Sequence, residues 1–109
     1  MKKKLFVTLC ILGCYIGYGQ YTSIPDSNFE LALISLGIDS EGAPVDGQIL
    51  IADIVNVTNL DISNSGINNL SGLEFFSSLE ILNVSGNNLD KLELQNTSLT
   101  EIRANNCNL

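Results

Sequence analysis

The strongest constraint on this fold is an apolar template that returns through the second half of the chain about every 20 residues. The template reads L-x-x-L-x-L-x-x-N-x-L, and its middle position is filled by Leu60, Leu82 and Ile102, which are 22 and 20 residues apart. A unit this short cannot bury its apolar face alone, so neighbouring units must stack. The pattern therefore favours a solenoid of stacked coils over a β-sandwich of unrelated strands. The three copies consist of Val57, Leu60, Ile62, Ser65 and Ile67; of Leu79, Leu82, Val84, Asn87 and Leu89; and of Leu99, Ile102, Ala104, Cys107 and Leu109.

Repeats of this length and pattern are typical of leucine-rich repeats. We expect the centre of each copy to form a short strand, with the two Leu-type residues inward and the intervening residues outward. The Asn position should turn the chain and bury an amide that bonds backbone groups of neighbouring coils. The outward residues form the candidate binding surface, which consists of Asn59, Asp61, Ser63, Ile81, Asn83, Ser85, Glu101, Arg103 and Asn105.

A further copy of the template lies half a period away from its neighbours. It consists of Leu89, Leu92, Leu94, Thr97 and Leu99. We expect its alternating segment to return along the convex side of the solenoid, opposite the sheet. In the preceding coil the return is expected to be irregular or 3₁₀-helical, with Phe75 and Phe76 filling the interior.

Residues 20–56 are expected to form a helical cap over the first coil, because the exposed end of a solenoid needs a polar cover. A helix should begin near Asp26 or Ser27, where Ser27 and Glu30 have capping-box spacing, and should end at Gly37. The segment 48–55 is predicted to be a second short helix or an extended element. The expected buried face of the first helix comprises Phe29, Ala32, Leu33 and Leu36.

The first 19 residues have the pattern of a secretory signal, with a basic start followed by an apolar run. The run is too short and too rich in Gly for a membrane span. Gly17 and Gly19 suit signal peptidase, and cleavage after Gly19 leaves Gln20 as the first residue. The alternative is a lipoprotein, in which Cys14 becomes the lipidated N-terminus. After cleavage at Gly19, Cys107 is the one remaining cysteine, so no disulfide framework is expected.

The cap and the first repeat together resemble those of secreted bacterial leucine-rich repeat proteins, of which the internalins share a related helical cap. The resemblance rests on the segments IPDxxFExAL from Ile24, GID from Gly37, IxxVTxLD from Ile54 and GIxxLxGL from Gly66, and on the later LxL…NTxL from Leu92. It implies an α+β leucine-rich-repeat solenoid with short parallel strands, an irregular or β convex side and a small helical cap. It also implies an extracellular or cell-surface binding role with no reaction attached.

The chain departs from this family pattern in its last coils. Val84 and Ala104 stand where related repeats often have Cys, and Cys107 stands where they have Asn. The array is short, and no C-terminal cap, wall anchor or sorting domain is recognisable. Residues 57–109 are therefore expected to be repeats that are incomplete at the C-terminus, open to edge-to-edge self-association.

Composition excludes several classes of function. The chain has no His, so a Ser-His-Asp relay and a His-containing zinc site are not available. Without the three N-terminal lysines, two Lys/Arg stand against twelve Asp/Glu, a net charge of −10 that disfavours nucleic acid. The acidic loop with Asp39, Glu41 and Asp46 does not fit the ligand spacing of an EF-hand, and a solvated loop is the better interpretation.

The sequence thus predicts a non-enzymatic module, without cofactor or metal, that binds a protein or glycan through the outward face of its sheet. The alternative is a structural cap-and-repeat segment of a longer surface protein with no ligand of its own. Nucleic-acid binding and a membrane span are not expected.

We predict that the chain exported from a bacterial host begins at Gln20, as a free or cyclised residue. Intact-mass and N-terminal peptide mass spectrometry would identify that end directly. A product that begins at a lipidated Cys14 would contradict the prediction.

Overall fold

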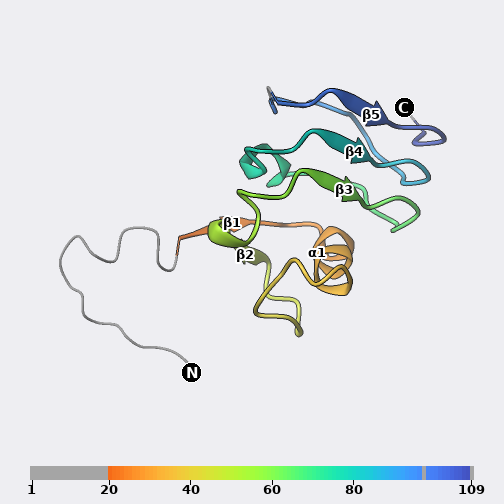
Figure 1. Ribbon diagram of the computed structural model, residues 1–109. Coiled ribbons are helices and arrows are strands. Elements are labelled where there is room, and N and C mark those ends of the chain that lie inside the picture. Colours follow the sequence, from red (N-terminus) through yellow and green to blue (C-terminus); the bar gives the residue numbers. More distant parts are fainter. Residues whose placement is uncertain (1–19, 97, 109) are drawn as a thin grey trace, which may run out of the picture.

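The computed structural model describes residues 20–96 and 98–108. The predicted leader with Cys10 and Cys14, and template positions Thr97 and Leu109, lie outside the described residues. Within them, a cap precedes a stack of coils in which each coil contributes one strand to a parallel sheet (Figure 1). The prediction of an α+β leucine-rich-repeat solenoid is confirmed.

The sheet joins β3 (Asn59–Asp61), β4 (Ile81–Asn83) and β5 (Glu101–Arg103) in that order, all parallel. Its register pairs Leu60 with Leu82 and Leu82 with Ile102, as the template spacing predicts. The coils nevertheless differ in length, and the difference is absorbed on the return side. The first return contains the 3₁₀ turn η3 (Leu73–Phe75), whereas residues 90–96 run without helix or strand.

The core is the interior of the coils, and it continues into the cap. Leu60 and Leu82 are fully buried, as are most of the inward template positions, whereas Ile102 is 47% exposed. Burying apolar area is the main favourable term in folding, so the first two coils and the cap carry most of the stability. The buried apolar residues are Ile24, Phe29, Leu33, Ile49, Ile54, Leu60, Ile62, Ile67, Leu73, Phe76, Leu79, Leu82, Val84, Leu89 and Cys107.

Asn87 joins adjacent coils through a side-chain amide that is buried and fully bonded. Its Oδ1 accepts from the backbone N–H groups of Ser65 and Ile67, at 2.9 and 3.0 Å. Its Nδ2 donates to the carbonyls of Ile62 and Val84, at 2.9 and 2.8 Å. The predicted role of the Asn position is therefore confirmed.

The same position in the last coil is occupied by Cys107, which is buried. Its Sγ donates to the Val84 carbonyl at 3.1 Å. A thiol is a weak donor, so this one bond is weaker than the four hydrogen bonds that the amide of Asn87 makes. The thiol thus takes the place of the Asn side chain of the repeat template and keeps one hydrogen bond to the preceding coil.

The cap contains a helix and a two-stranded antiparallel sheet, and the sheet was not expected from the sequence. Strand β1 (Tyr21–Ser23) pairs with β2 (Gln48–Leu50), and η2 (Ile51–Asp53) follows β2. The segment 48–55 is therefore extended first and 3₁₀-helical next, a combination of the two predicted states. The strands are too short to show a clear alternation in the sequence.

Helix α1 (Ser27–Ser35) ends as predicted, with Leu36 as C-cap and Gly37 in the left-handed region at φ 76°. Phe29 and Leu33 are fully buried, but Leu36 is 49% exposed, so its assignment to the buried face was wrong. Leu36 lies where the helix ends, and a helical spacing no longer determines the direction of its side chain.

Asp26 is the N-cap of α1, and its Oδ1 accepts from the N–H groups of Asn28 and Phe29. The predicted capping box between Ser27 and Glu30 is wrong. Glu30 is buried instead, and it accepts from the backbone N–H groups of Asp46 and Gly47 at 3.0 and 2.8 Å. Burial raises the pKa of this carboxyl, although the two N–H donors oppose the shift.

Asp26 also fastens the cap to the first coil. Its second oxygen, Oδ2, accepts from the N–H groups of Asn68 and Asn69 at 2.8 and 2.9 Å, and Asn28 Nδ2 donates to the Gly66 carbonyl. One carboxylate thus satisfies two donors at the helix start and two in the repeat.

Phe76 completes the junction, because its ring stacks on Phe29 with centroids 6.3 Å apart. Phe75, which was also expected to fill the interior, is 42% exposed, and that expectation was wrong. The 3₁₀ turn η3 has three residues per turn, so adjacent side chains point in different directions and only one of the two reaches the core.

Tyr21 lies at the edge of the cap and donates its hydroxyl to Glu41 Oε2 at 2.7 Å. This hydrogen bond, with burial and the nearby carboxylates, raises the pKa of Tyr21 to about 12. The negative charges oppose formation of a phenolate beside them.

We predict that Asp26→Ala lowers the free energy of unfolding by about 2–3 kcal/mol, since it removes a helix cap and two hydrogen bonds to a charged acceptor. Urea denaturation followed by circular dichroism measures the change. Ser27→Ala is the matched control, because this neighbouring hydroxyl is exposed, and it should change stability by less than about 0.5 kcal/mol. Equal effects of the two substitutions would contradict the role of Asp26.

We also predict that Tyr21 titrates near pH 12. In residues 20–109 it is the one tyrosine, so tyrosinate absorbance reports on it alone. Because its folded pKa lies above its unfolded value of 10.0, the stability contribution is present below pH 10 and is lost as the pH rises through about 12. Glu41→Gln should lower the midpoint towards 10, whereas Glu93→Gln in the repeats should leave it unchanged. A midpoint near 10 in the unmodified chain would refute the contact.

Candidate functional site

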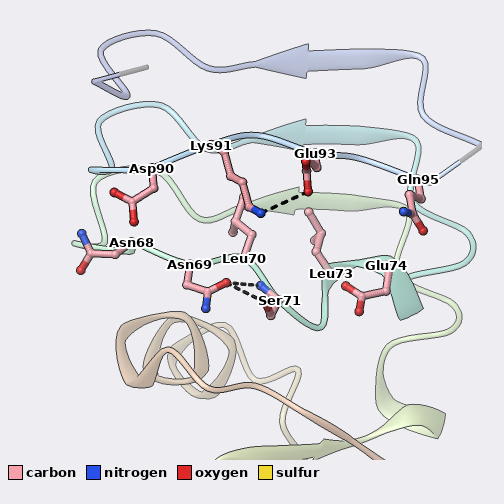
Figure 2. A pocket seen from close by; sticks show the side chains of 10 residues that line it. All are labelled: Asn68, Asn69, Leu70, Ser71, Leu73, Glu74, Asp90, Lys91, Glu93 and Gln95. Carbon is pink, nitrogen blue, oxygen red and sulfur yellow. Dashed lines mark hydrogen bonds and ion pairs between the residues drawn. The ribbon is translucent and has the colours of Figure 1, made fainter.

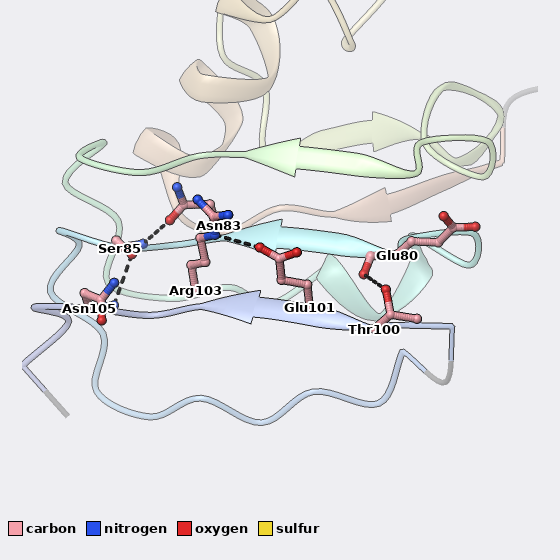
Figure 3. Close-up of polar contacts among 7 residues, drawn as sticks. All are labelled: Glu80, Asn83, Ser85, Thr100, Glu101, Arg103 and Asn105. Carbon is pink, nitrogen blue, oxygen red and sulfur yellow. Dashed lines mark hydrogen bonds and ion pairs between the residues drawn. The ribbon is translucent and has the colours of Figure 1, made fainter.

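The outward face of the sheet is the candidate site, and the structure places the nine residues predicted for it on that face or just beyond the strand ends. Strand register arranges six of them in two rows that cross all three strands. One row is Asn59, Ile81 and Glu101, and the other is Asp61, Asn83 and Arg103. Ser63, Ser85 and Asn105 follow their strands in the corresponding positions, and the last two are drawn in Figure 3.

Asp61 forms the anionic end of the second row. Its Oδ1 accepts from the hydroxyl and the N–H of Ser63, at 2.6 and 3.1 Å. These bonds, together with the positive charge of Arg103, hold the pKa of Asp61 below its ordinary value. The carboxylate is exposed and stays ionised at physiological pH, so it can accept hydrogen bonds from a partner.

Arg103 forms the cationic end of the same row, and its Nε donates to Glu101 Oε2 at 2.7 Å (Figure 3). The ion pair is exposed and contributes little to stability. It does fix the guanidinium over the sheet, with the planar donor geometry that suits carboxylates of a partner.

Asn83 and Ser85 link the two ends of the face. Asn83 Oδ1 accepts from the N–H of Ser85 at 3.0 Å, and Ser85 Oγ accepts from the N–H of Asn105 at 3.0 Å (Figure 3). The polar side chains are thus held by backbone groups and are oriented before any partner arrives. Such preorganisation lowers the entropic cost of binding.

Ile81 is the apolar residue of this face. It lies on the central strand, between Asn59 and Glu101, and is half-buried. An apolar side chain surrounded by polar ones is the usual arrangement at the centre of a protein interface.

The acidic loop of the cap uses its oxygens for local hydrogen bonds. Asp39 Oδ1 accepts from the N–H of Glu41, and Asp46 Oδ1 accepts from the N–H of Gln48. Burial raises the pKa of Asp39. Among residues 20–96 and 98–108, His, Cys, Asp and Glu side chains do not form a group of three or more that could hold a metal ion.

A hollow of about 450 Å³ lies on the return side of the solenoid, and it was not predicted from the sequence. Residues 68–74 form one wall and residues 90–95 the other, and Lys91 forms an ion pair with Glu93 at 3.4 Å (Figure 2). The alternating segment Lys91-Leu92-Glu93, half a period from the neighbouring repeats, was predicted to return along this side, and it forms part of the second wall. Its separation from the first wall depends on the irregular turn at η3, which a template cannot specify.

In the described part of the chain, none of the helices is both long and apolar enough to span a membrane. The leader predicted from the sequence lies outside that part.

No protein-family model matches the chain, and neither does any of the curated proteins. Solved structures do match. The functional domain of InlJ from Listeria monocytogenes, described as including a cysteine ladder, superposes with a TM-score of 0.60 at 31% identity, over 75% of this chain and 18% of that one. Internalin C2 from the same organism superposes with a TM-score of 0.63 at 22% identity, over 83% of this chain and 41% of that one.

The chain spans less than half the length of either structure that it matches. The shared part contains the cap and the coils, which are the features on which the sequence resemblance to the internalins rested. The chain therefore has an internalin-like leucine-rich-repeat fold, with a short parallel sheet and an N-terminal cap built around one helix.

Proposed function

We propose that this chain is an extracellular or cell-surface binding module that captures a protein or glycan on the outward face of its sheet, without catalysing a reaction. The proposal rests mainly on one observation. The two rows Asn59, Ile81, Glu101 and Asp61, Asn83, Arg103 are exposed or half-buried and are not needed to fill the core.

The chemistry of the face supports recognition of another molecule. It offers a carboxylate at Asp61, an amide at Asn83 and a guanidinium at Arg103, in one row across three strands. Strands in a sheet lie about 4.8 Å apart, so the row presents its three different groups over about 10 Å. That span suits a short peptide segment or a sugar unit.

The resemblance to the internalins implies an extracellular setting, and the first 19 residues have the pattern of a secretory signal. Lipidation at Cys14 remains the alternative way of attachment. The net charge of −10 for residues 20–109 weighs against nucleic acid as the partner.

The test compares two triple variants on defined arrays of extracellular proteins and glycans. Asp61→Ala, Asn83→Ala and Arg103→Ala together should abolish every specific signal of the unmodified chain, because they remove one whole row of the face. The matched control is Asn69→Ala, Glu74→Ala and Gln95→Ala, which alters the return-side hollow and should retain the signal.

The result also identifies the ligand class, since protein and glycan spots are read separately. A signal that survives the face variant and disappears in the control would place the site in the hollow and overturn the proposal. Circular dichroism of both variants confirms that a lost signal is not a lost fold.

A structural role in a longer surface protein, with no ligand of its own, is the second candidate. It is favoured by the coverage of the matches, since the chain corresponds to 18% and 41% of the two internalin structures. An extended reading frame with the same repeat spacing, together with blank arrays, would support this candidate.

A further inference from the structure

The cap is the part of the molecule in which negative charge is least compensated. Residues 20–90 contain no Lys, Arg or His, so every ionisable side chain of the cap is either a carboxyl or the hydroxyl of Tyr21. Charges of one sign within one small unit repel each other, and protonation removes the repulsion. The carboxyls of the cap are those of Asp26, Glu30, Asp39, Glu41, Asp46 and Asp53.

Glu30 is the carboxyl of the cap that is completely shielded from water. Its side chain is 0% exposed, and with Phe29 and Leu33 it is one of the three buried residues of α1. Both of its oxygens accept from the loop 39–47, Oε2 from the N–H of Asp46 and Oε1 from the N–H of Gly47. The Gly47 carbonyl in turn accepts from the N–H of Ile24 at 2.8 Å. The helix, the loop and the segment after β1 therefore meet at this carboxyl.

The ionisable groups that face this junction are acidic as well. Asp46 lies next to Glu30, and its negative charge opposes ionisation of the Glu30 carboxyl. Asp39, at the start of the same loop, is 6% exposed and is influenced by the charges of Asp46 and Asp53. Asp53 is fixed beside the loop, because its Oδ2 accepts from the N–H and the hydroxyl of Ser40 at 2.9 and 2.8 Å. Burial raises the pKa of both Glu30 and Asp39, and the neighbouring carboxylates add to the shift.

We propose that mild acid strengthens the cap, because protonation of Glu30 and Asp39 stabilises the loop 39–47 against helix α1. A neutral Glu30 carboxyl keeps a carbonyl oxygen that accepts from the loop, while the buried negative charge and its repulsion by Asp46 are gone. Ionisation retains the hydrogen bonds but adds the cost of a buried charge that has no cation beside it. The cap is therefore held more firmly in mild acid than at neutral pH.

The direction of the effect follows from linkage. A carboxyl whose pKa is higher in the folded chain than in the unfolded chain adds stability as the pH falls through its folded value, and the gain is complete below its unfolded value. The unfolded values are 4.5 for Glu30 and 3.8 for Asp39. Asp61 has a lowered pKa, so its contribution to stability is lost only as the pH falls below 3.8. Between neutral pH and 4.5 the stability should therefore rise.

This response is opposite to ordinary acid denaturation, in which hydrogen-bonded carboxylates lose their stabilising charge. It is also independent of the proposed binding function, because the nine residues of the outward face lie on or just after β3, β4 and β5 and none of them belongs to the cap. A chain of this kind would have its N-terminal end best protected in acidic surroundings.

The test measures the unfolding equilibrium constant of the exported chain by urea denaturation at several pH values from about 7 to 4.5. The constant should fall about tenfold or more on acidification, since each additional proton bound by the folded chain changes it by up to about tenfold per pH unit. The α-amino group of Gln20 does not contribute, because an α-amino group titrates at about 8, above this range.

Two substitutions that replace a carboxyl with a neutral amide should remove the response. Glu30→Gln alone should reduce the change in the unfolding constant, and Glu30→Gln with Asp39→Asn should hold it within about threefold across the range. Glu80→Gln is the matched control, because it removes an exposed carboxyl from the repeats and should retain the full response.

Nuclear magnetic resonance reads the same carboxyl in the folded chain, even where Glu30→Gln does not fold. The amide proton of Gly47, which donates to Glu30, should titrate with a midpoint above 4.5. Asp46→Asn keeps the backbone donor but removes the neighbouring negative charge, so it should lower this midpoint.

Three results would overturn the proposal: an unfolding constant that stays level or rises between about pH 7 and 4.5, a double variant that keeps the full response, or a Gly47 midpoint at or below 4.5. Specific binding on the arrays by such a chain would leave the proposed function standing. A chain that gains stability in acid but binds nothing on the arrays would refute the binding function alone.

Discussion

The amide of Asn87 is the interaction on which the stacking of coils depends. Each coil turns sharply at the end of its strand, and the turn leaves backbone groups pointing into a dry interior. One side chain with two donors and two acceptor lone pairs satisfies four of these groups, three of them on the preceding coil (Ile62, Ser65 and Ile67) and one, the Val84 carbonyl, on its own. Without it, the buried groups would each carry a desolvation cost of about 1–3 kcal/mol.

Asp26 plays the corresponding role at the junction with the cap, where a stack would otherwise end in an exposed apolar face. Its two oxygens face two different elements, so the start of the helix and the first return are positioned by the same carboxylate. The stacked rings of Phe29 and Phe76 then fill the space behind it. Polar and apolar contacts thus act at the same junction, and the orientation of the sheet relative to the cap follows from both.

The repeat template was sufficient to predict the sheet. Once the register is known, strand alternation places Leu60, Leu82 and Ile102 inward and the residues on either side of them outward. Features outside the repeat pattern were harder to predict from the sequence. Glu30 does not form the expected capping box, because its carboxylate accepts from the backbone N–H groups of Asp46 and Gly47 instead. These donors lie in a loop that is distant in sequence, so local spacing could not predict the contact. Phe75 and Leu36 were misplaced at element ends, where local spacing no longer fixes direction. The outward residues were located correctly by sequence, whereas the return-side hollow depends on tertiary packing.

The unequal lengths of the two coils have an evolutionary consequence. Strand register is preserved between Leu60, Leu82 and Ile102 although the intervening segments differ by two residues, and the difference is confined to the return side. Insertions and deletions on that side can therefore accumulate without shifting the outward face of the sheet. A lineage can thus change the length of a coil on the return side while the row of Asp61, Asn83 and Arg103 stays in register across the strands.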